Sequence, residues 1–250
     1  MVAALIVTGF LAATRPACAD QTYDVSGVDQ YRVGTTGAST HIAYSGEQLL
    51  TIDRSGKQTK YTADVRYTRA DDSGKASVRG RFVQALVDGT FQDQSDDDPD
   101  FLTILNQPFA IQLDGTTMRD LRAMRTKIPF SASSPLGNST LKGFLRPSPG
   151  GKIRGRRVFG VRFTANGPMS GAVRDKSLTA VSGNINMDGT AYYAADSALL
   201  LGLDATLTIN GNLSDSQRQI PVKIVYRRTI RANDDTNAWS AAEATPQIKR

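Results

Sequence analysis

The sequence is poor in the residues on which most catalytic and metal sites depend. Its 250 residues include one cysteine, one histidine and one tryptophan. A single histidine excludes a metal site built from several imidazoles, and a Ser-His-Asp triad would have to use His41. His41 lies in an alternating segment, and no nucleophile-elbow motif is present. We therefore expect His41 to be a polar strand residue, and we expect no catalytic residue, no metal and no cofactor.

Glutamate is also scarce. Of the 24 acidic residues only Glu47 and Glu243 are glutamates, and the others are aspartates. Glutamate favours helices, whereas aspartate favours turns and helix caps. Together with 22 glycines, this bias predicts a turn-rich β-protein with few helices. The length suits one domain with a sizeable core.

The first nineteen residues have the layout of a secretory signal peptide. An apolar run from Val2 to Ala13 is followed by Pro16 and the small-residue triplet 17–19, which matches an Ala-x-Ala cleavage site. The run is shorter than the about 20 residues that a membrane helix needs. We predict cleavage after Ala19, so that the mature chain begins at Asp20 and is exported to the periplasm or secreted.

Two other interpretations of this segment stay open. No basic residue precedes the apolar run, since Arg15 follows it, so the segment is alternatively a buried N-terminal element. A lipoprotein signal would make Cys18 the acylated residue, although Arg15 stands where such signals have an apolar residue. Cleavage after Ala19 would remove the only cysteine and leave neither a disulfide nor a thiolate.

Apolar and polar residues alternate with a period of two through most of the chain, which is typical of half-buried strands. The alternation predicts a mainly β fold, an antiparallel meander that forms a curved sheet, half-barrel or sandwich with one wet and one buried face. The strand-like segments are 40–44, 48–52, 61–67, 77–84, 157–163, 182–187, 190–193, 199–209 and 222–230.

Turns and helices are predicted from local signals. Aspartate, asparagine and glycine predict turns at 53–56, 71–74, 165–168, 188–189 and 210–211. Short helices are expected near 98–106, where Asp98 and Pro99 form a helix start, and near 117–125, where apolar residues recur every three positions. Segment 131–151 is rich in Pro, Gly and Ser and predicts a loop and a sub-sheet boundary. We expect one domain over 20–232 and a disordered tail over 233–250.

The formal net charge is +6, and part of the basic excess is clustered. Such clusters favour anionic surfaces. A nucleic-acid surface would interleave aromatic residues with the basic ones, so we expect no nucleic-acid partner. The candidate contacts to an anionic envelope surface are Lys152, Arg154, Arg156, Arg157, Arg227, Arg228 and Arg231.

Two short patterns resemble known sites only superficially. Ser139 and Lys142 match a Ser-x-x-Lys pattern that acyl-transfer enzymes place at a helix start, but glycines flank it and a strand-like segment follows. The acidic run 93–100 lacks the glycine and the closing glutamate of a helix-loop-helix calcium motif. We interpret the first as a loop leading into a strand and the second as a solvated, helix-capping loop.

These observations favour a non-enzymatic, exported cell-envelope protein. The first hypothesis is a binding module for a hydrophobic small molecule, a lipid or a lipidated partner, because Leu201, Leu203 and Leu207 repeat on one face of a long strand. The alternative is a structural or scaffolding protein that contacts anionic surfaces. A third hypothesis is a hydrolase whose site is assembled from distant aspartates.

Overall fold

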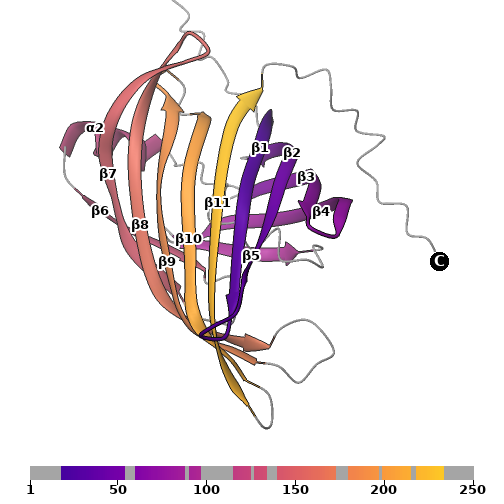
Figure 1. Ribbon diagram of the computed structural model, residues 1–250. Coiled ribbons are helices and arrows are strands. Elements are labelled where there is room, and N and C mark those ends of the chain that lie inside the picture. Colours follow the sequence, from indigo (N-terminus) through magenta and orange to yellow (C-terminus); the bar gives the residue numbers. More distant parts are fainter. Residues whose placement is uncertain are drawn as a thin grey trace, which may run out of the picture.

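The computed structural model describes residues 18–53, 60–87, 90–96, 115–124, 127–133, 140–172, 180–196, 199–214 and 218–233. Within these ranges the chain forms eleven strands and one helix, so the mainly β prediction is confirmed (Figure 1). The elements are β1 (Cys18–Val33), β2 (Ser39–Asp53), β3 (Lys60–Asp71), β4 (Gly74–Val87), β5 (Thr90–Asp96), α2 (Gly115–Met124), β6 (Ile128–Ser133), β7 (Thr140–Ile153), β8 (Arg156–Ala172), β9 (Ala180–Ala194), β10 (Leu200–Ser214) and β11 (Gln219–Asn233).

The strands form a single curved meander in which each strand lies beside its neighbour in sequence. The pairings are antiparallel, except that β5 and β6 meet over only two parallel pairs, Thr90 with Ser131 and Phe91 with Ala132. The first strand also pairs with the last, from Thr22 opposite Asn233 onward. The sheet therefore curls until β5 and β6 touch, but no full ladder closes it at that seam.

The alternation predicted from the sequence sets the two faces of the sheet. In β10, Leu203 and Leu207 are fully buried, whereas Thr206 and Thr208 between and beyond them are half-buried on the outer face. Successive side chains of a strand point to opposite faces, so each long strand contributes one row to the interior. The buried apolar residues of all these rows form one core cluster.

The helix α2 confirms the one predicted near 117–125. Met118 and Leu121 are three residues apart, so they lie on one face of the helix, and both are buried. The Arg122 side chain donates a hydrogen bond to the carbonyl oxygen of Ala194 at 3.5 Å, and its guanidinium lies over the Phe159 ring. These contacts place the helix against β7 and the ends of β8 and β9 (Figure 1).

Three of the predicted turns are wrong, because the strands continue through them. Gly189 lies inside β9, Gly211 lies inside β10, and β8 runs without a break through 165–168. A Cβ atom at Gly211 would lie 2.3 Å from the Ser182 carbonyl oxygen, so this glycine permits close approach of two strands. The predicted turn at 71–74 is confirmed, since β3 ends at Asp71 and β4 begins at Gly74.

The predicted loop at 131–151 is also wrong in the described part of that segment, whereas the predicted sub-sheet boundary stays a prediction. Residues 131–133 belong to β6 and residues 140–151 to β7, and both strands pair within the same sheet. The pairing of β7 with β8 shifts register between Ser148 and Gly151, and such an irregularity lets a strand accommodate Pro149.

Several predictions fall on residues outside the described ranges. They are the helix near 98–106, the apolar run of the signal peptide and the tail beyond Asn233, which is itself the last residue of β11. Cys18 and Ala19, the predicted end of the signal peptide, are the first residues of β1 and pair with Asp53 and Ile52.

Candidate functional site

A buried ion pair lies on the inward face of the sheet, between Asp29 of β1 and Arg228 of β11. Their side chains are 0% and 1% exposed. Arg228 donates from Nη1 to Asp29 Oδ1 at 2.5 Å and from Nη2 to Oδ2 at 3.3 Å, which makes the pair bidentate. Nη1 also donates to the carbonyl oxygen of Arg227 at 2.9 Å. Both charged groups are therefore desolvated and held in fixed positions.

Three tyrosines surround this pair. The Tyr31 hydroxyl donates to Asp29 Oδ2 at 3.5 Å, and the guanidinium of Arg228 lies 4.7 Å from the centre of the Tyr44 ring. Tyr31 and Tyr226 meet edge to face with ring centres 5.9 Å apart. We call these five residues, Asp29, Tyr31, Tyr44, Tyr226 and Arg228, the polar cluster; it spans the adjacent strands β11, β1 and β2.

Burial governs the protonation of the cluster. Desolvation raises the pKa of Asp29 above its ordinary value of 3.8, although the charge and the hydrogen bonds of Arg228 act in the opposite direction. Desolvation also raises the pKa of the Tyr31, Tyr44 and Tyr226 hydroxyls, so these groups stay neutral donors. Burial alone would lower the pKa of Arg228 and is the largest single influence, but the charge and the hydrogen bond of Asp29, together with Tyr67 and Tyr44, outweigh it, so the net shift is upward.

A glycine makes room for the arginine. Gly27 of β1 is directly opposite Arg228 in the register of the two strands. A Cβ atom on Gly27 would lie 2.7 Å from Nη1 and 2.8 Å from Cδ of Arg228. The Arg228 side chain therefore lies across the backbone of β1, which brings its guanidinium to Asp29.

The buried polar side chains of the described residues are confined to one side of the sheet. They are Thr22, Asp29, Gln48 and Arg228, all on β11, β1 and β2. Gln48 faces inward from β2 and is 2% exposed, and its Oε1 atom has no hydrogen-bond partner.

The part of the sheet next to β11, formed by β10, β9 and β8, is apolar on its inward face. Its inward rows are closely packed, as Phe163 and Gly189 show. The two residues are directly opposite each other, and a Cβ atom on Gly189 would lie 2.4 Å from Cζ of the ring. The buried residues of these rows include Val161, Phe163, Ile185, Met187, Leu203 and Leu207. The interior is thus amphipathic across its width.

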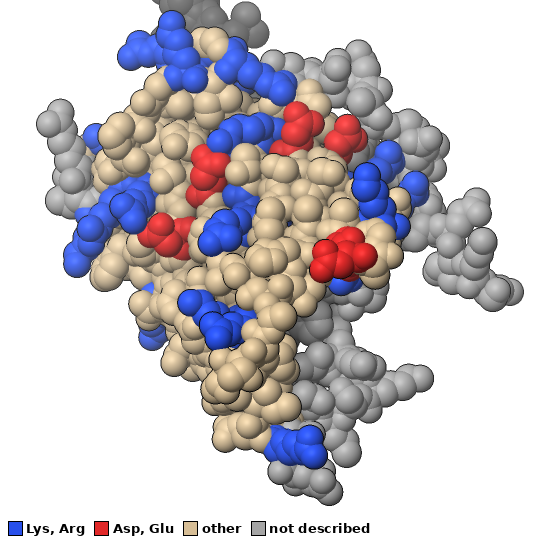
Figure 2. Space-filling model, in the orientation of Figure 1, with Lys and Arg blue, Asp and Glu red and all other residues tan. Residues whose placement is uncertain are grey.

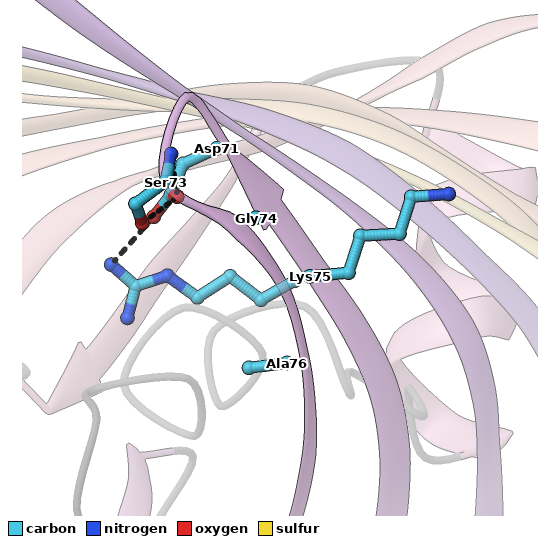
Figure 3. Close-up of a pocket in the computed structure, with 6 residues that line it drawn as sticks. Asp71, Ser73, Gly74, Lys75 and Ala76 are labelled. Atoms are coloured by element: carbon cyan, nitrogen blue, oxygen red, sulfur yellow. Dashed lines mark hydrogen bonds and ion pairs between the residues drawn. The ribbon is translucent and has the colours of Figure 1, made fainter.

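A hollow of about 320 Å³ opens at the turn between β3 and β4 (Figure 3). The Asp71 carboxylate accepts hydrogen bonds from the backbone N–H and the hydroxyl of Ser73, which hold its pKa below 3.8, and lies 3.7 Å from Arg69 Nη2. Lys75 extends away from Asp71 (Figure 3). Arg69 is directly opposite Tyr44, so the hollow adjoins the polar cluster.

The structure brings most of the predicted basic residues together at the tip of the β7–β8 hairpin. Arg154 lies 3.4 Å from Asp24, Arg156 lies 3.5 Å from Asp196, and Arg231 lies 2.8 Å from Asp204. Ile153 of the tip and Arg231 both lie close to Gly202, which places the two sequence clusters side by side.

Only part of this basic charge is left without a counter-charge. Lys152 and Arg157 are exposed, and neither has an ion pair to any described residue. On the face shown in Figure 2, basic side chains are mixed with acidic ones and do not form one uniform patch.

The prediction for Arg228 is wrong. Arg228 is buried in the polar cluster and has no access to an external surface, whereas its neighbour Arg227 is exposed on the outer face opposite Val28. The physical reason is strand alternation, because Arg228 shares the face of the buried residues Tyr226 and Ile230. The same alternation, in which Asp29 shares the inward face of β1 with Val25 and Tyr31, was the signal that could have placed Asp29 inside, although it does not encode the pairing with Arg228.

The other candidate residues from the sequence analysis are not brought together in one site by the described part of the structure. His41 is exposed on the outer face of β2, and Lys142 is exposed in the strand β7, as expected for a loop leading into a strand. Residues 97–100 of the acidic run and Ser139 lie outside the described ranges. Among the described residues, no group of three or more His, Cys, Asp or Glu side chains is placed to hold a metal ion.

No protein-family model matches the chain, and no curated protein is similar enough in sequence to match it. Within the described ranges, no helix has the length and the apolar character needed to cross a membrane. The function is therefore inferred from the geometry of the chain itself.

Proposed function

We propose that the chain is an exported cell-envelope protein that binds a hydrophobic ligand, or the lipid of a lipidated partner, on the inward face of its curved sheet, without catalysing a reaction. The observation that carries this proposal is the division of the interior into the apolar rows of β8–β10 and the polar groups of β11, β1 and β2. A ligand with an apolar chain and a polar end is complementary to both sides.

The polar cluster supports binding better than hydrolysis. A hydrolase of the kind considered above needs two carboxylates in unequal environments within one cleft. In the described part of the interior, the partner of the buried carboxylate of Asp29 is Arg228, not a second carboxylate. The tyrosine hydroxyls around it are neutral donors, which can orient a polar ligand group but offer no nucleophile.

Export is compatible with the way in which β1 begins. Asp20, the first residue of the proposed mature chain, pairs with Thr51 of β2. Cleavage after Ala19 would remove only two residues from β1 and would leave its pairing with β11, which starts at Thr22, intact. The intact mass of the protein recovered from the cell envelope or the medium tests this step; a mass that includes residues 1–19 contradicts it.

Ligand binding is tested by extracting the natively purified protein with organic solvent and analysing the extract by mass spectrometry. The paired variants are Ala205→Met, which adds bulk to the interior, and Thr206→Met, which places the same side chain at the next residue on the outer face. We expect Ala205→Met, and not Thr206→Met, to lower the amount of co-purified lipid. A wild-type extract without lipid, together with no binding of a fluorescent fatty-acid probe, would contradict the proposal.

A second candidate function has one observation in its favour. Lys152 and Arg157 stand on the same hairpin tip without counter-charges among the described residues, which suits a scaffolding role at an anionic surface. The test is sedimentation with vesicles that contain anionic lipid. The double variant Lys152→Glu/Arg157→Glu is expected to lose binding, whereas the control Lys223→Glu, on the exposed outer face of β11, is expected to keep it.

A further inference from the structure

Gln48 is one of three described residues that bury a side-chain polar atom without a hydrogen-bond partner for that atom. Its side chain is 2% exposed and points inward between Gly46 and Leu50 of the same strand. Its Oε1 atom has no hydrogen-bond partner among the residues that the structure describes. A buried amide oxygen without a donor destabilises the folded protein, and most buried acceptors in proteins are therefore paired.

The neighbouring polar groups are engaged elsewhere. Tyr23 is directly opposite Gln48 on β1, and its hydroxyl donates to the carbonyl oxygen of Leu200 at 3.0 Å. On the other side Gln48 is opposite Val65 of β3, whose side chain has no donor. Arg228 is bound to Asp29. Gln48 therefore lies between apolar and engaged neighbours, and none of the described residues donates a hydrogen bond to Oε1.

We propose that Gln48 is a ligand-recognition residue, whose Oε1 accepts a hydrogen bond from a hydroxyl or amide N–H carried by the ligand of the inward face. This inference rests on the proposed function and narrows its ligand class. The ligand has an apolar chain, which contacts residues such as Leu50 and Ala63 beside Gln48, and a hydrogen-bond donor attached to that chain. A pure hydrocarbon or an ester without a donor leaves Oε1 unpaired and binds more weakly.

The test compares two probes that differ in the donor. Oleyl alcohol can donate a hydrogen bond, whereas methyl oleate can only accept one. We expect the wild-type protein to bind the alcohol about tenfold more tightly than the ester, the effect of one net hydrogen bond. In Gln48→Met, which keeps the length of the side chain and removes the acceptor, we expect the two affinities to become nearly equal. Gln30→Met, the same substitution at a half-buried site on the outer-facing row of β1, is the control and should retain the preference.

A second measurement separates recognition from a structural role. Because Oε1 has no partner in the ligand-free protein, Gln48→Met should leave the urea midpoint of that protein unchanged or raise it. A lower midpoint would mean that Oε1 is satisfied internally, by a bound water for example, and would overturn the inference. An unchanged alcohol preference in Gln48→Met would also overturn it while leaving the proposed function intact. Failure of both probes to bind the wild-type protein would instead contradict the proposed function and, with it, this inference.

Discussion

In both the polar and the apolar part of the interior, a glycine makes room for a large side chain of the neighbouring strand, but the side chain is charged in one part and apolar in the other. On the polar side, Gly27 makes room for the Arg228 side chain of the next strand, and on the apolar side Gly189 makes room for the Phe163 ring. Burial of the phenyl ring stabilises the fold directly. Burial of a charged pair contributes little net stability, because desolvation offsets the attraction between the charges. The polar side is therefore the part of the core that stability alone does not explain, and it is where we place ligand recognition.

The largest expected effect comes from breaking the ion pair on one side only. Arg228→Met leaves Asp29 buried without its partner, so the free energy of unfolding should fall by about 3–5 kcal/mol. The double variant Asp29→Leu/Arg228→Met removes both charges and should recover most of that loss. Urea unfolding followed by circular dichroism measures both. A loss below about 1 kcal/mol for Arg228→Met would show that Asp29 is hydrated in the folded protein.

The next largest effect on stability is expected when the two glycines, Gly27 and Gly189, are replaced by alanine. Gly27→Ala and Gly189→Ala should each lower the free energy of unfolding by about 1–3 kcal/mol, because the added methyl group overlaps the Arg227 carbonyl oxygen and the Arg228 side chain at the first position and the Phe163 ring at the second. Phe163→Leu removes the ring tip and should recover part of the loss in Gly189→Ala. Equal stability of Gly189→Ala and the wild-type protein would contradict the close packing of the apolar side.

Breaking an ion pair on the outer face should lower the free energy of unfolding less than breaking the buried pair. Arg231 binds Asp204 on that face, with side chains 36% and 45% exposed. Arg231→Met should cost at most about 1 kcal/mol, since exposed ion pairs are well solvated and weak. Comparison with Arg228→Met under identical conditions separates the effect of burial from that of pairing. A loss as large as that of Arg228→Met would indicate that the outer pair is desolvated in solution.

The smallest expected effect is a difference between the pKa values of two aspartates, Asp29 and Asp71. Burial raises the pKa of Asp29, so its contribution to stability is present below 3.8 and is lost as the pH rises through the raised value. The hydrogen bonds of Ser73 lower the pKa of Asp71, so its contribution is present above 3.8 and is lost as the pH falls through the lowered value. NMR titration of the two carboxyl carbons should give midpoints on opposite sides of 3.8. A midpoint of Asp29 below 3.8 would mean that Arg228 outweighs desolvation.

Much of the fold follows from the alternation of apolar and polar residues. The wrongly predicted turns share one cause. The alternation over 222–230 predicts β11 well, and the spacing of Met118 and Leu121 predicts α2. The errors arise where glycine lies inside a strand, as at Gly189 and Gly211. A glycine that allows close approach and a glycine that allows a turn look the same in one sequence.

The candidate site was harder to predict from the sequence than the fold. The inward position of Arg228 follows from the face it shares with Tyr226 and Ile230, but its partner Asp29 is 199 residues away in the chain. Only the pairing of β1 with β11 brings them together, and no local pattern encodes that pairing. The orphaned oxygen of Gln48 is likewise a property of its three-dimensional neighbours.

The pairing of β1 with β11 also has a consequence for the time course of folding. The first of the described strands has the last of them as one of its two partners, from Thr22 opposite Asn233 to Val33 opposite Val222. Contacts over such a sequence separation form slowly and need nearly the whole chain. The Asp29–Arg228 pair thus forms only after β11 has left the ribosome. For a chain that we propose is exported, this dependence on β11 delays completion of the sheet, and with it burial of the polar cluster, until β11 has been made.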